Sequence, residues 1–111
     1  MSRGVRFEPE ASDELDEAAV WYKHRATGLG TKFLNAVDQT LTMVTRWPHA
    51  APLETDLPSD LVVRRAQVHQ FPYRIVYLLT PTAIRILAVA HDSRQPGYWH
   101  ERIKIDPLTS P

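Results

Sequence analysis

The fold of this chain is decided by residues 71–91, which read FPYRIVYLLTPTAIRILAVAH. Two runs rich in β-branched and aromatic residues, 73–79 and 84–91, flank the segment 80–83, which contains a proline. Such side chains favour strands, and two such runs separated by a short loop indicate a β-hairpin. The sequence therefore predicts two antiparallel strands joined by a four-residue loop.

Side chains along each predicted strand alternate between the two faces of the sheet. In the first run, Tyr73, Ile75, Tyr77 and Leu79 share one face and Arg74, Val76 and Leu78 the other; in the second, Ile84, Ile86, Ala88 and Ala90 oppose Arg85, Leu87, Val89 and His91. Apolar residues on both faces predict strands that are covered on both sides. Arg74 is the exception, because a guanidinium in apolar surroundings needs an acidic partner, carbonyls or a ligand.

The residues before the hairpin predict one strand and two helices. A short strand is expected over about 4–8, and Pro9 suits the first turn of a helix over about 9–26. Its apolar face is formed by Ala11, Leu15, Ala18, Ala19 and Tyr22. A second helix is expected over about 30–46, with a stripe formed by Phe33, Leu34, Val37, Leu41 and Val44. Gly28 is predicted to end the first helix as a left-handed C′ residue.

Residues 48–60 contain three prolines and are predicted to form a loop. A strand should follow over about 61–68, and the last dozen residues should lie loosely at the surface. The order β-α-α-β-β-β predicts an α+β fold with an N-terminal strand, a helical hairpin and a three-stranded antiparallel sheet. We expect the helical hairpin to cover one face of the sheet and to leave the opposite face partly open.

Length and composition limit the class of protein. The 111 residues fit a single domain over 1–111 and contain no cysteine, which excludes disulfides and thiolate metal sites. No apolar run approaches the roughly 20 residues of a membrane helix. The five histidines, at 24, 49, 69, 91 and 100, show no metal-ligand spacing. We therefore expect a soluble cytoplasmic protein with no cofactor, no metal site and no membrane partner.

The charges are balanced overall but unevenly placed. Thirteen Lys and Arg residues match thirteen Asp and Glu residues. Residues 1–56 contain six basic and nine acidic residues, a net −3, and residues 57–111 contain seven and four, a net +3. Because non-specific nucleic-acid binding is driven by positive charge, a neutral chain is a poor candidate for it, although a local basic face remains possible.

Three candidate binding residues belong to the predicted strands. Arg64 and Arg65 are adjacent in a strand and point to opposite faces, so one of them should lie on the open face. His91 ends the last strand, where it could act as a general acid or base near neutral pH. The alternative for His91 is a ring that bonds the adjacent turn.

The segment after the last strand contains Arg94, Tyr98 and Trp99. Arg94 could pair with a phosphate or a carboxylate. Tyr98 and Trp99 could stack on a base or anchor a protein interface. The alternative for this aromatic pair is that it folds back and closes one end of the core.

Several segments together resemble the RelE/ParE superfamily of type II toxin–antitoxin toxins. The most specific are Phe71–Tyr77, Ile86–His91 and Arg94–Trp99; the segment from Trp21-Tyr22 through Gly28-Leu29-Gly30 to Phe33-Leu34 also matches, as does the proline after the second helix. The resemblance covers about residues 5–102. It implies an α+β fold with a mostly antiparallel sheet of about four strands, and a cognate antitoxin that wraps around the toxin in a hetero-oligomer.

The superfamily divides by target, and the resemblance implies two alternatives. RelE-like members cut messenger RNA in the ribosome with basic and aromatic residues, to which Arg74, Arg94 and Tyr98 are similar here, with Arg64 or Arg65 as further basic positions. ParE-like members are not nucleases and block DNA gyrase; their sequences commonly end in the pattern His-x-x-Arg-x-Pro-x-x-Trp. In this second case the target-binding candidates are Arg64, Arg65, His91, Arg94, Tyr98 and Trp99.

Two features favour the gyrase hypothesis. The chain is neutral, whereas a toxin that engages ribosomal RNA is expected to be strongly basic. The segment His91–Trp99 is also more similar to ParE-type members. The alternatives are a ribosome-dependent endoribonuclease and a toxin remnant that retains only antitoxin binding.

Overall fold

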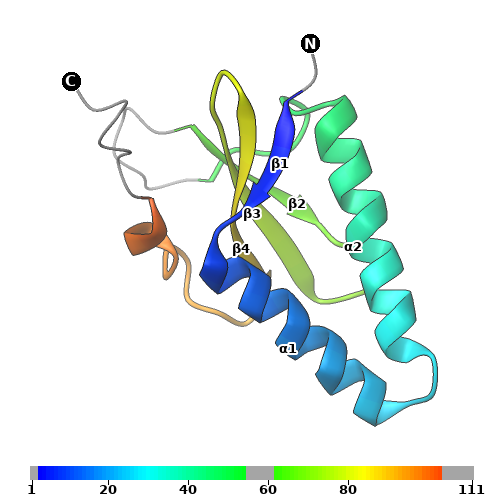
Figure 1. Cartoon of the computed structure of the whole chain (residues 1–111). Helices are drawn as coiled ribbons and strands as arrows, with labels where there is room; N and C mark the ends of the chain where they lie inside the picture. Colours follow the sequence, from blue (N-terminus) through cyan, green and yellow to red (C-terminus); the bar gives the residue numbers. More distant parts are fainter. Residues whose placement is uncertain (1–2, 55–61, 104–111) are drawn as a thin grey trace.

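The computed structural model describes residues 3–54 and 62–103. The elements follow the predicted order and are β1 (Gly4–Phe7), α1 (Pro9–Arg25), α2 (Leu29–Arg46), β2 (Val63–Gln67), β3 (Tyr73–Leu79), β4 (Ala83–His91) and the 3-10 helix η1 (His100–Arg102). Figure 1 shows the helical hairpin beside the twisted sheet. The predicted α+β fold is confirmed; the expected strand start at Leu61 lies outside the described residues.

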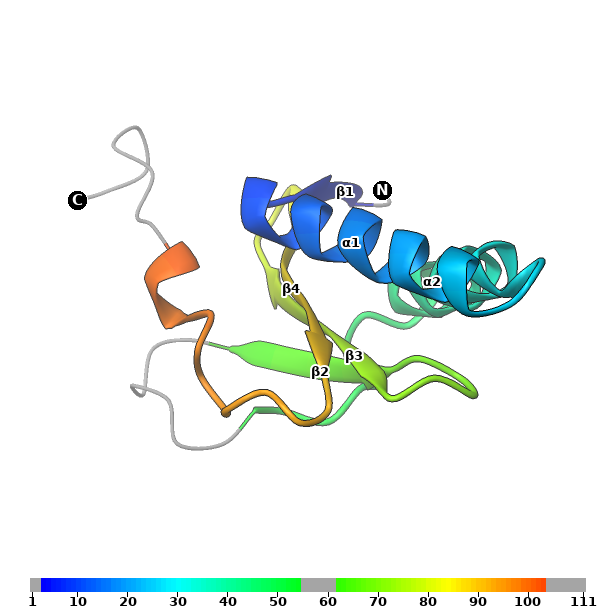
Figure 2. The same cartoon turned by 90° about the horizontal axis from the view of Figure 1, so that it is seen from below.

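The sheet has four strands in the order β1-β4-β3-β2. The pairs β2–β3 and β3–β4 are antiparallel, as predicted for the C-terminal sheet, and β1 pairs in parallel with β4. Parallel neighbours need a connection that crosses a face of the sheet, and α1 and α2 provide it. Figure 2 shows that both helices lie on one face.

The core between the helices and the sheet is formed by the predicted helical stripes. Ala11, Ala18 and Tyr22 of α1 are buried, as are Phe33, Val37 and Val44 of α2. Two details were wrong. Leu34 is 43% exposed, and Gly28 has the predicted positive φ of 81° but caps the start of α2, because Ala26 caps the end of α1. The link between the two helices therefore lies at residues 26–28, one residue earlier than expected.

A β-bulge in β4 changes the predicted face alternation. Tyr77 pairs with Ile86 but Val76 pairs with Ala88, so Leu87 is the extra residue. Leu87 and Ala88 are both buried on the face away from the helices, and Val89 turns toward the helices. The predicted alternation is correct up to Leu87 and wrong after it. A bulge also leaves backbone groups outside the ladder, free for other partners.

The face of the sheet away from the helices is covered in part by the C-terminal segment. Trp99 is 1% exposed and packs with Val63, Val76, Leu87, Ala88 and Ala90. Tyr98 and Ile103 pack against the same cluster. Trp99 is therefore a core residue, and its assignment as a target-binding residue was wrong. The last dozen residues, 100–111, were also expected to lie loosely at the surface, whereas Ile103, within their described part (residues 100–103), packs against this cluster.

Candidate functional site

The C-terminal segment is fixed to α1 by one carboxylate. Glu14 accepts hydrogen bonds from the Tyr98 hydroxyl at 2.6 Å, from Arg102 Nη1 at 2.7 Å and Nη2 at 3.2 Å, and from the Val89 backbone N–H at 3.1 Å. Arg102 Nη1 also donates to the Leu87 carbonyl at 3.0 Å. We call Glu14, Val89, Tyr98 and Arg102 the Glu14 clasp. Two of its bonds use backbone groups at the β4 bulge.

The clasp raises the pKa of two of its members, Tyr98 and Arg102. Burial, together with the hydrogen bond and the negative charge of Glu14, raises the pKa of Tyr98 well above that of a free tyrosine. Burial alone would lower the pKa of Arg102, but its bond to Glu14 and the charge of Glu14 outweigh burial and raise it. Tyr98 is therefore a neutral hydrogen-bond donor at physiological pH, not a general base.

Arg94 stands on the outer side of the clasp. Its guanidinium carbon lies 4.1 Å from the centroid of the Tyr98 ring, and that of Arg102 lies 5.0 Å from the same centroid. Arg94 is exposed. Its side chain makes no ion pair with another residue of the described chain. A cation stacked on an aromatic ring is held in place while its outer donors stay free.

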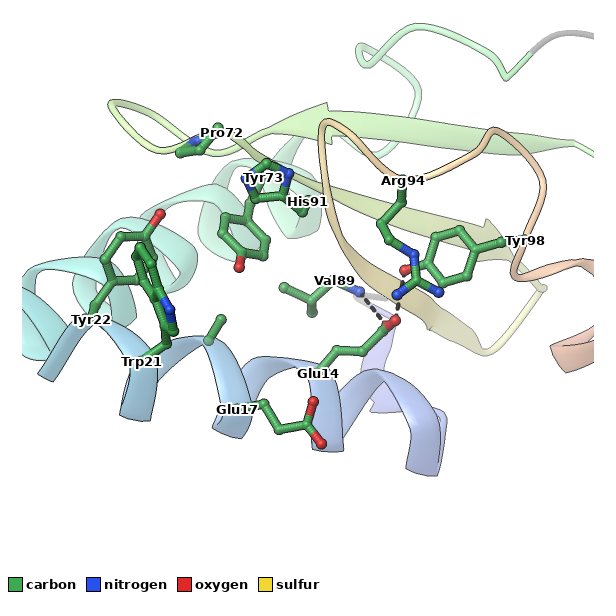
Figure 3. Close-up of a pocket in the computed structure, with 11 residues that line it drawn as sticks. Glu14, Glu17, Trp21, Tyr22, Pro72, Tyr73, Val89, His91, Arg94 and Tyr98 are labelled. Atoms are coloured by element: carbon green, nitrogen blue, oxygen red, sulfur yellow. Dashed lines mark hydrogen bonds between the residues drawn. The ribbon is translucent and has the colours of Figure 1, made fainter. Parts of the chain in front are cut away.

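A groove runs from the Tyr98–Arg94 stack along α1 (Figure 3). Its cavity measures about 440 Å³ and is lined by Glu14, Glu17, Ala18, Trp21, Tyr22, Pro72, Tyr73, Val89, His91, Arg94 and Tyr98. We call it the aromatic groove. Trp21 is 52% exposed at its outer rim. Ring-lined walls with a few polar groups at one end are typical of sites that recognise an apolar side chain in a fixed orientation.

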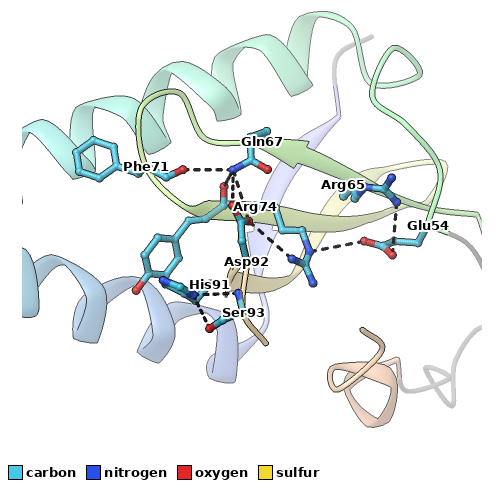
Figure 4. Close-up of polar contacts among 9 residues, drawn as sticks. Glu54, Arg65, Gln67, Phe71, Arg74, His91, Asp92 and Ser93 are labelled. Carbon is cyan, nitrogen blue, oxygen red and sulfur yellow. Dashed lines mark hydrogen bonds and ion pairs between the residues drawn. The ribbon is translucent and has the colours of Figure 1, made fainter. Parts of the chain in front are cut away.

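A second, polar depression lies on the opposite face of the sheet (Figure 4). Arg74 lies there between two carboxylates, with 3.9 Å from its Nε to Glu54 Oε1 and 3.7 Å from its Nη1 to Asp92 Oδ1. Arg65 lies 3.7 Å from Glu54. We call Glu54, Arg65, Arg74 and Asp92 the sheet-face cluster. The partner that the sequence required for Arg74 is therefore a pair of acidic side chains.

Arg64 and Arg65 do point to opposite faces, and both are tied to the loop before β2. Arg64 donates to the Ala51 carbonyl at 2.7 Å on the helix side of the sheet. Arg65 donates to the Leu53 carbonyl at 3.2 Å, and its side chain is 41% exposed. Of this pair, Arg65 is the residue on the open face, and Arg64 has a structural role.

His91 bonds the adjacent turn, which is the simpler of its two predicted roles. Its Nδ1 accepts from the Ser93 backbone N–H at 3.0 Å and lies 2.7 Å from Ser93 Oγ. Because Nδ1 is an acceptor, the neutral ring carries its proton on Nε2. His91 also lines the aromatic groove, where its ring meets Tyr73 edge-on at 5.1 Å.

The structure does not bring together all the candidate residues. Arg94 lines both the aromatic groove and the depression of the sheet-face cluster, but Tyr98 lines only the first and Arg74 only the second. The sequence missed Glu14 and Arg102, which form the clasp. Glu14 is one of several acidic residues in the first turns of α1, and no local pattern distinguishes it from the others. In residues 3–54 and 62–103, no group of three or more side chains could hold a metal ion.

The architecture of a strand, a helical hairpin and an antiparallel sheet is shared with solved structures of other proteins. A chain described as "Chromosomal ParDE TA system from P. aeruginosa" matches with a TM-score of 0.65 at 15% identity, covering 80% of this chain and 95% of that chain. A chain described as "The structure of YoeB dimer from Staphylococcus aureus" matches with a TM-score of 0.53 at 17% identity, covering 78% and 93%. At these identities the likeness establishes the fold alone.

Residues 5–96 match the family described as "ParE toxin of type II toxin-antitoxin system, parDE". The chain therefore belongs to the ParE toxin family, as the sequence resemblance predicted. Comparison with curated protein sequences finds no significant match. In the part of the chain that the structure describes, neither helix has the length and apolar character needed to span a membrane.

Proposed function

We propose that this chain acts as a cytoplasmic toxin that inhibits DNA gyrase without catalysing a reaction of its own, and that a cognate antitoxin neutralises it. Family membership supports the toxin role. The observation that favours a gyrase target over an RNA target is that two candidate nuclease residues already contact acidic side chains of the protein itself. Arg74 faces two carboxylates, and the Tyr98 hydroxyl donates a hydrogen bond to Glu14.

An RNA-cleaving site would need a lower pKa at Tyr98 and an Arg74 without neighbouring carboxylates. A general base near neutral pH needs a pKa close to the working pH, and the raised pKa of Tyr98 moves it away from that range. A phosphate approaching Arg74 would meet Glu54 and Asp92, whose charges oppose it. The chain is also neutral, with thirteen basic and thirteen acidic residues. An interaction surface fits these properties better than an RNA-cleaving site.

The test is a pair of assays on the purified toxin. In the first, relaxed plasmid, gyrase and ATP are incubated with increasing toxin, and supercoiled product is measured. In the second, a messenger RNA is translated in a purified system with the toxin, and its ends are mapped. Loss of supercoiling with intact message is the expected result. Normal supercoiling at micromolar excess of toxin would contradict the gyrase proposal.

A ribosome-dependent endoribonuclease is the second candidate, favoured by the three arginines around the depression on the open sheet face, which are Arg65, Arg74 and Arg94. It predicts cuts in translated message that disappear in Arg74→Ala or Arg94→Ala while thermal unfolding stays cooperative. A chain that leaves both supercoiling and message intact, and whose induction does not slow growth, would instead be a remnant that only binds antitoxin.

The aromatic groove is the candidate surface for the antitoxin. Recognition of a peptide in a groove uses apolar anchors for affinity and a few polar contacts for register. Trp21, Tyr22 and Tyr73 provide apolar walls, and Arg94 provides a polar end. Coexpression with the antitoxin from the neighbouring reading frame should restore growth and give a stable complex on size-exclusion chromatography.

A further inference from the structure

The clasp and the aromatic groove share Glu14, Val89 and Tyr98, and Arg94 lies on the Tyr98 ring at the end of the groove. We propose that Arg94, held on the ring of Tyr98 by Glu14, is the carboxylate-binding point at the end of the aromatic groove, for an antitoxin segment with an acidic residue beside an apolar one. This inference rests on the proposed antitoxin partnership and names the chemistry of its contact. Glu14 and Tyr98 are positioning residues for that contact.

The first argument is the contrast in ionic pairing among the arginines of this region. Arg102 is paired with Glu14, and Arg74 has carboxylates on two sides. Arg94 makes no ion pair within the described chain, although its side chain is restrained by the stack on Tyr98. A restrained, unpaired guanidinium can bind a carboxylate through a bidentate pair of hydrogen bonds with little loss of side-chain entropy.

The second argument is how Tyr98 is restrained. Its hydroxyl donates to Glu14 at 2.6 Å, and the same carboxylate is fixed by Arg102 and by the Val89 N–H. These bonds join α1, the β4 bulge and the C-terminal segment. The ring under Arg94 is therefore held by three elements of the fold, and the position of Arg94 depends on all three.

The third argument concerns the chemistry of the occupant. The groove next to Arg94 is walled by Trp21, Tyr22 and Tyr73 and is suited to an apolar side chain. Glu17 lines the groove from α1 (Figure 3), and Glu14, the other lining carboxylate, is paired with Arg102. An acidic residue of the occupant is therefore favoured at the Arg94 end. A nucleic acid is a poorer fit, because a phosphate backbone needs several cations in a row and this groove has one unpaired arginine.

The free toxin provides the first readout. In the NMR spectrum the Cδ protons of Arg94 should be shifted upfield by the Tyr98 ring. Tyr98→Leu should remove that shift, Glu14→Ala should reduce it, and Tyr98→Phe should keep much of it because the ring remains. The Trp99 indole resonance reports that the segment stays folded. An Arg94 spectrum that is unchanged in Tyr98→Leu would overturn the positioning role.

The second readout is binding to the full antitoxin encoded beside the toxin gene, measured by calorimetry. Arg94→Gln should weaken binding about 10- to 100-fold, as expected for loss of a charge-assisted contact. Arg46→Gln is the matched control, since Arg46 is an exposed arginine that lines neither groove, and it should bind like wild type. Equal affinity of Arg94→Gln and wild type would overturn the inference.

The contact itself is identified by a double-mutant cycle. Each acidic residue of the antitoxin is changed to its amide and tested against wild-type toxin and Arg94→Gln. One such change should weaken binding to wild type about as much as Arg94→Gln does and add little to it. If no acidic position couples to Arg94, the inference fails while the toxin–antitoxin pairing stands. Wild-type toxin that does not bind the antitoxin at all would refute both.

Discussion

The Glu14 clasp and the sheet-face cluster contain the same charged groups but differ in geometry. In the clasp, Glu14 has four hydrogen bonds of 2.6–3.2 Å to Val89, Tyr98 and Arg102. In the sheet-face cluster, Arg74 lies 3.7 and 3.9 Å from its two acidic neighbours. Direct hydrogen bonds make the clasp a structural joint. The longer distances in the sheet-face cluster balance charge without fixing the side chains to each other.

The two regions also differ in what they leave available. The clasp satisfies Tyr98 and Arg102 and presents Arg94 unpaired at its edge. The sheet-face cluster uses its acidic residues to neutralise its arginines. In the first region a hydrogen-bonded joint supports an exposed, unpaired arginine, and in the second region neighbouring carboxylates already compensate the arginines. This difference is why we place recognition at Arg94 and not at Arg74.

The largest expected effect tests whether the segment after β4 is part of the folded core. Trp99→Ala removes the largest fully buried side chain, which packs on the face of the sheet away from the helices. The free energy of unfolding should fall by about 3–5 kcal/mol. Urea denaturation followed by circular dichroism measures it. A loss below about 1 kcal/mol would mean that the segment after β4 is not part of the cooperative unit.

The next effect tests the clasp itself. Glu14→Gln leaves Arg102 without its counter-charge, and the two side chains are 18% and 14% exposed. Breaking a buried pair costs about 3–5 kcal/mol, and partial exposure should reduce this to about 2 kcal/mol. Glu17→Gln is the control on the same helix, because Glu17 is exposed, and it should change stability by less than about 0.5 kcal/mol. Equal effects of the two variants would remove the distinction between the clasp and an ordinary surface charge.

The same denaturation assay on the sheet-face cluster should give a smaller effect. Arg74 and Glu54 are 13% and 9% exposed, but the ion pairs of Arg74 have no direct hydrogen bond and Glu54 keeps Arg65 nearby, so Arg74→Gln should lose about 1 kcal/mol. Arg65→Gln, with a side chain that is 41% exposed, should lose still less. If Arg74→Gln destabilises the protein more than Glu14→Gln does, the comparison between the two regions is reversed.

The smallest effect is a pH dependence. Burial and Glu14 raise the pKa of Tyr98 in the folded protein, whereas the unfolded chain has the ordinary value near 10. The stabilisation is therefore fully present below about pH 10 and is lost as the pH rises toward the folded pKa. Stability of the wild type should fall more steeply above pH 10 than that of Tyr98→Phe. Parallel curves would show that the Tyr98 hydroxyl does not contribute through the clasp.

The helices and strands were largely predictable because their signals are local. The stripe through Ala11, Ala18 and Tyr22 and the alternation in β3 follow from the sequence alone, as does the need of Arg74 for a partner, although the sequence did not identify that partner. The β4 bulge was not predictable, since it arises from the register between two strands. The clasp depends on that bulge and joins residues 75 to 88 positions apart. Glu14 therefore resembles any acidic residue in the first turns of a helix until the tertiary structure is known.

Arg94 and Trp99 have different roles although they are close in the sequence. Arg94 and Trp99 come from one short segment, yet one is exposed on the Tyr98 ring and the other is buried. Sequence reasoning grouped them as one binding surface because both residue types are common in interfaces. Burial separates them, so substitutions at Trp99 report on folding and substitutions at Arg94 report on recognition.

The most direct test of the proposed function is gyrase supercoiling of relaxed plasmid in the presence of wild-type toxin and of Arg74→Gln. The account predicts that both inhibit supercoiling with similar concentration dependence, because the sheet-face cluster takes no part in a catalytic step. Supercoiling that proceeds normally with wild-type toxin at micromolar excess would contradict it.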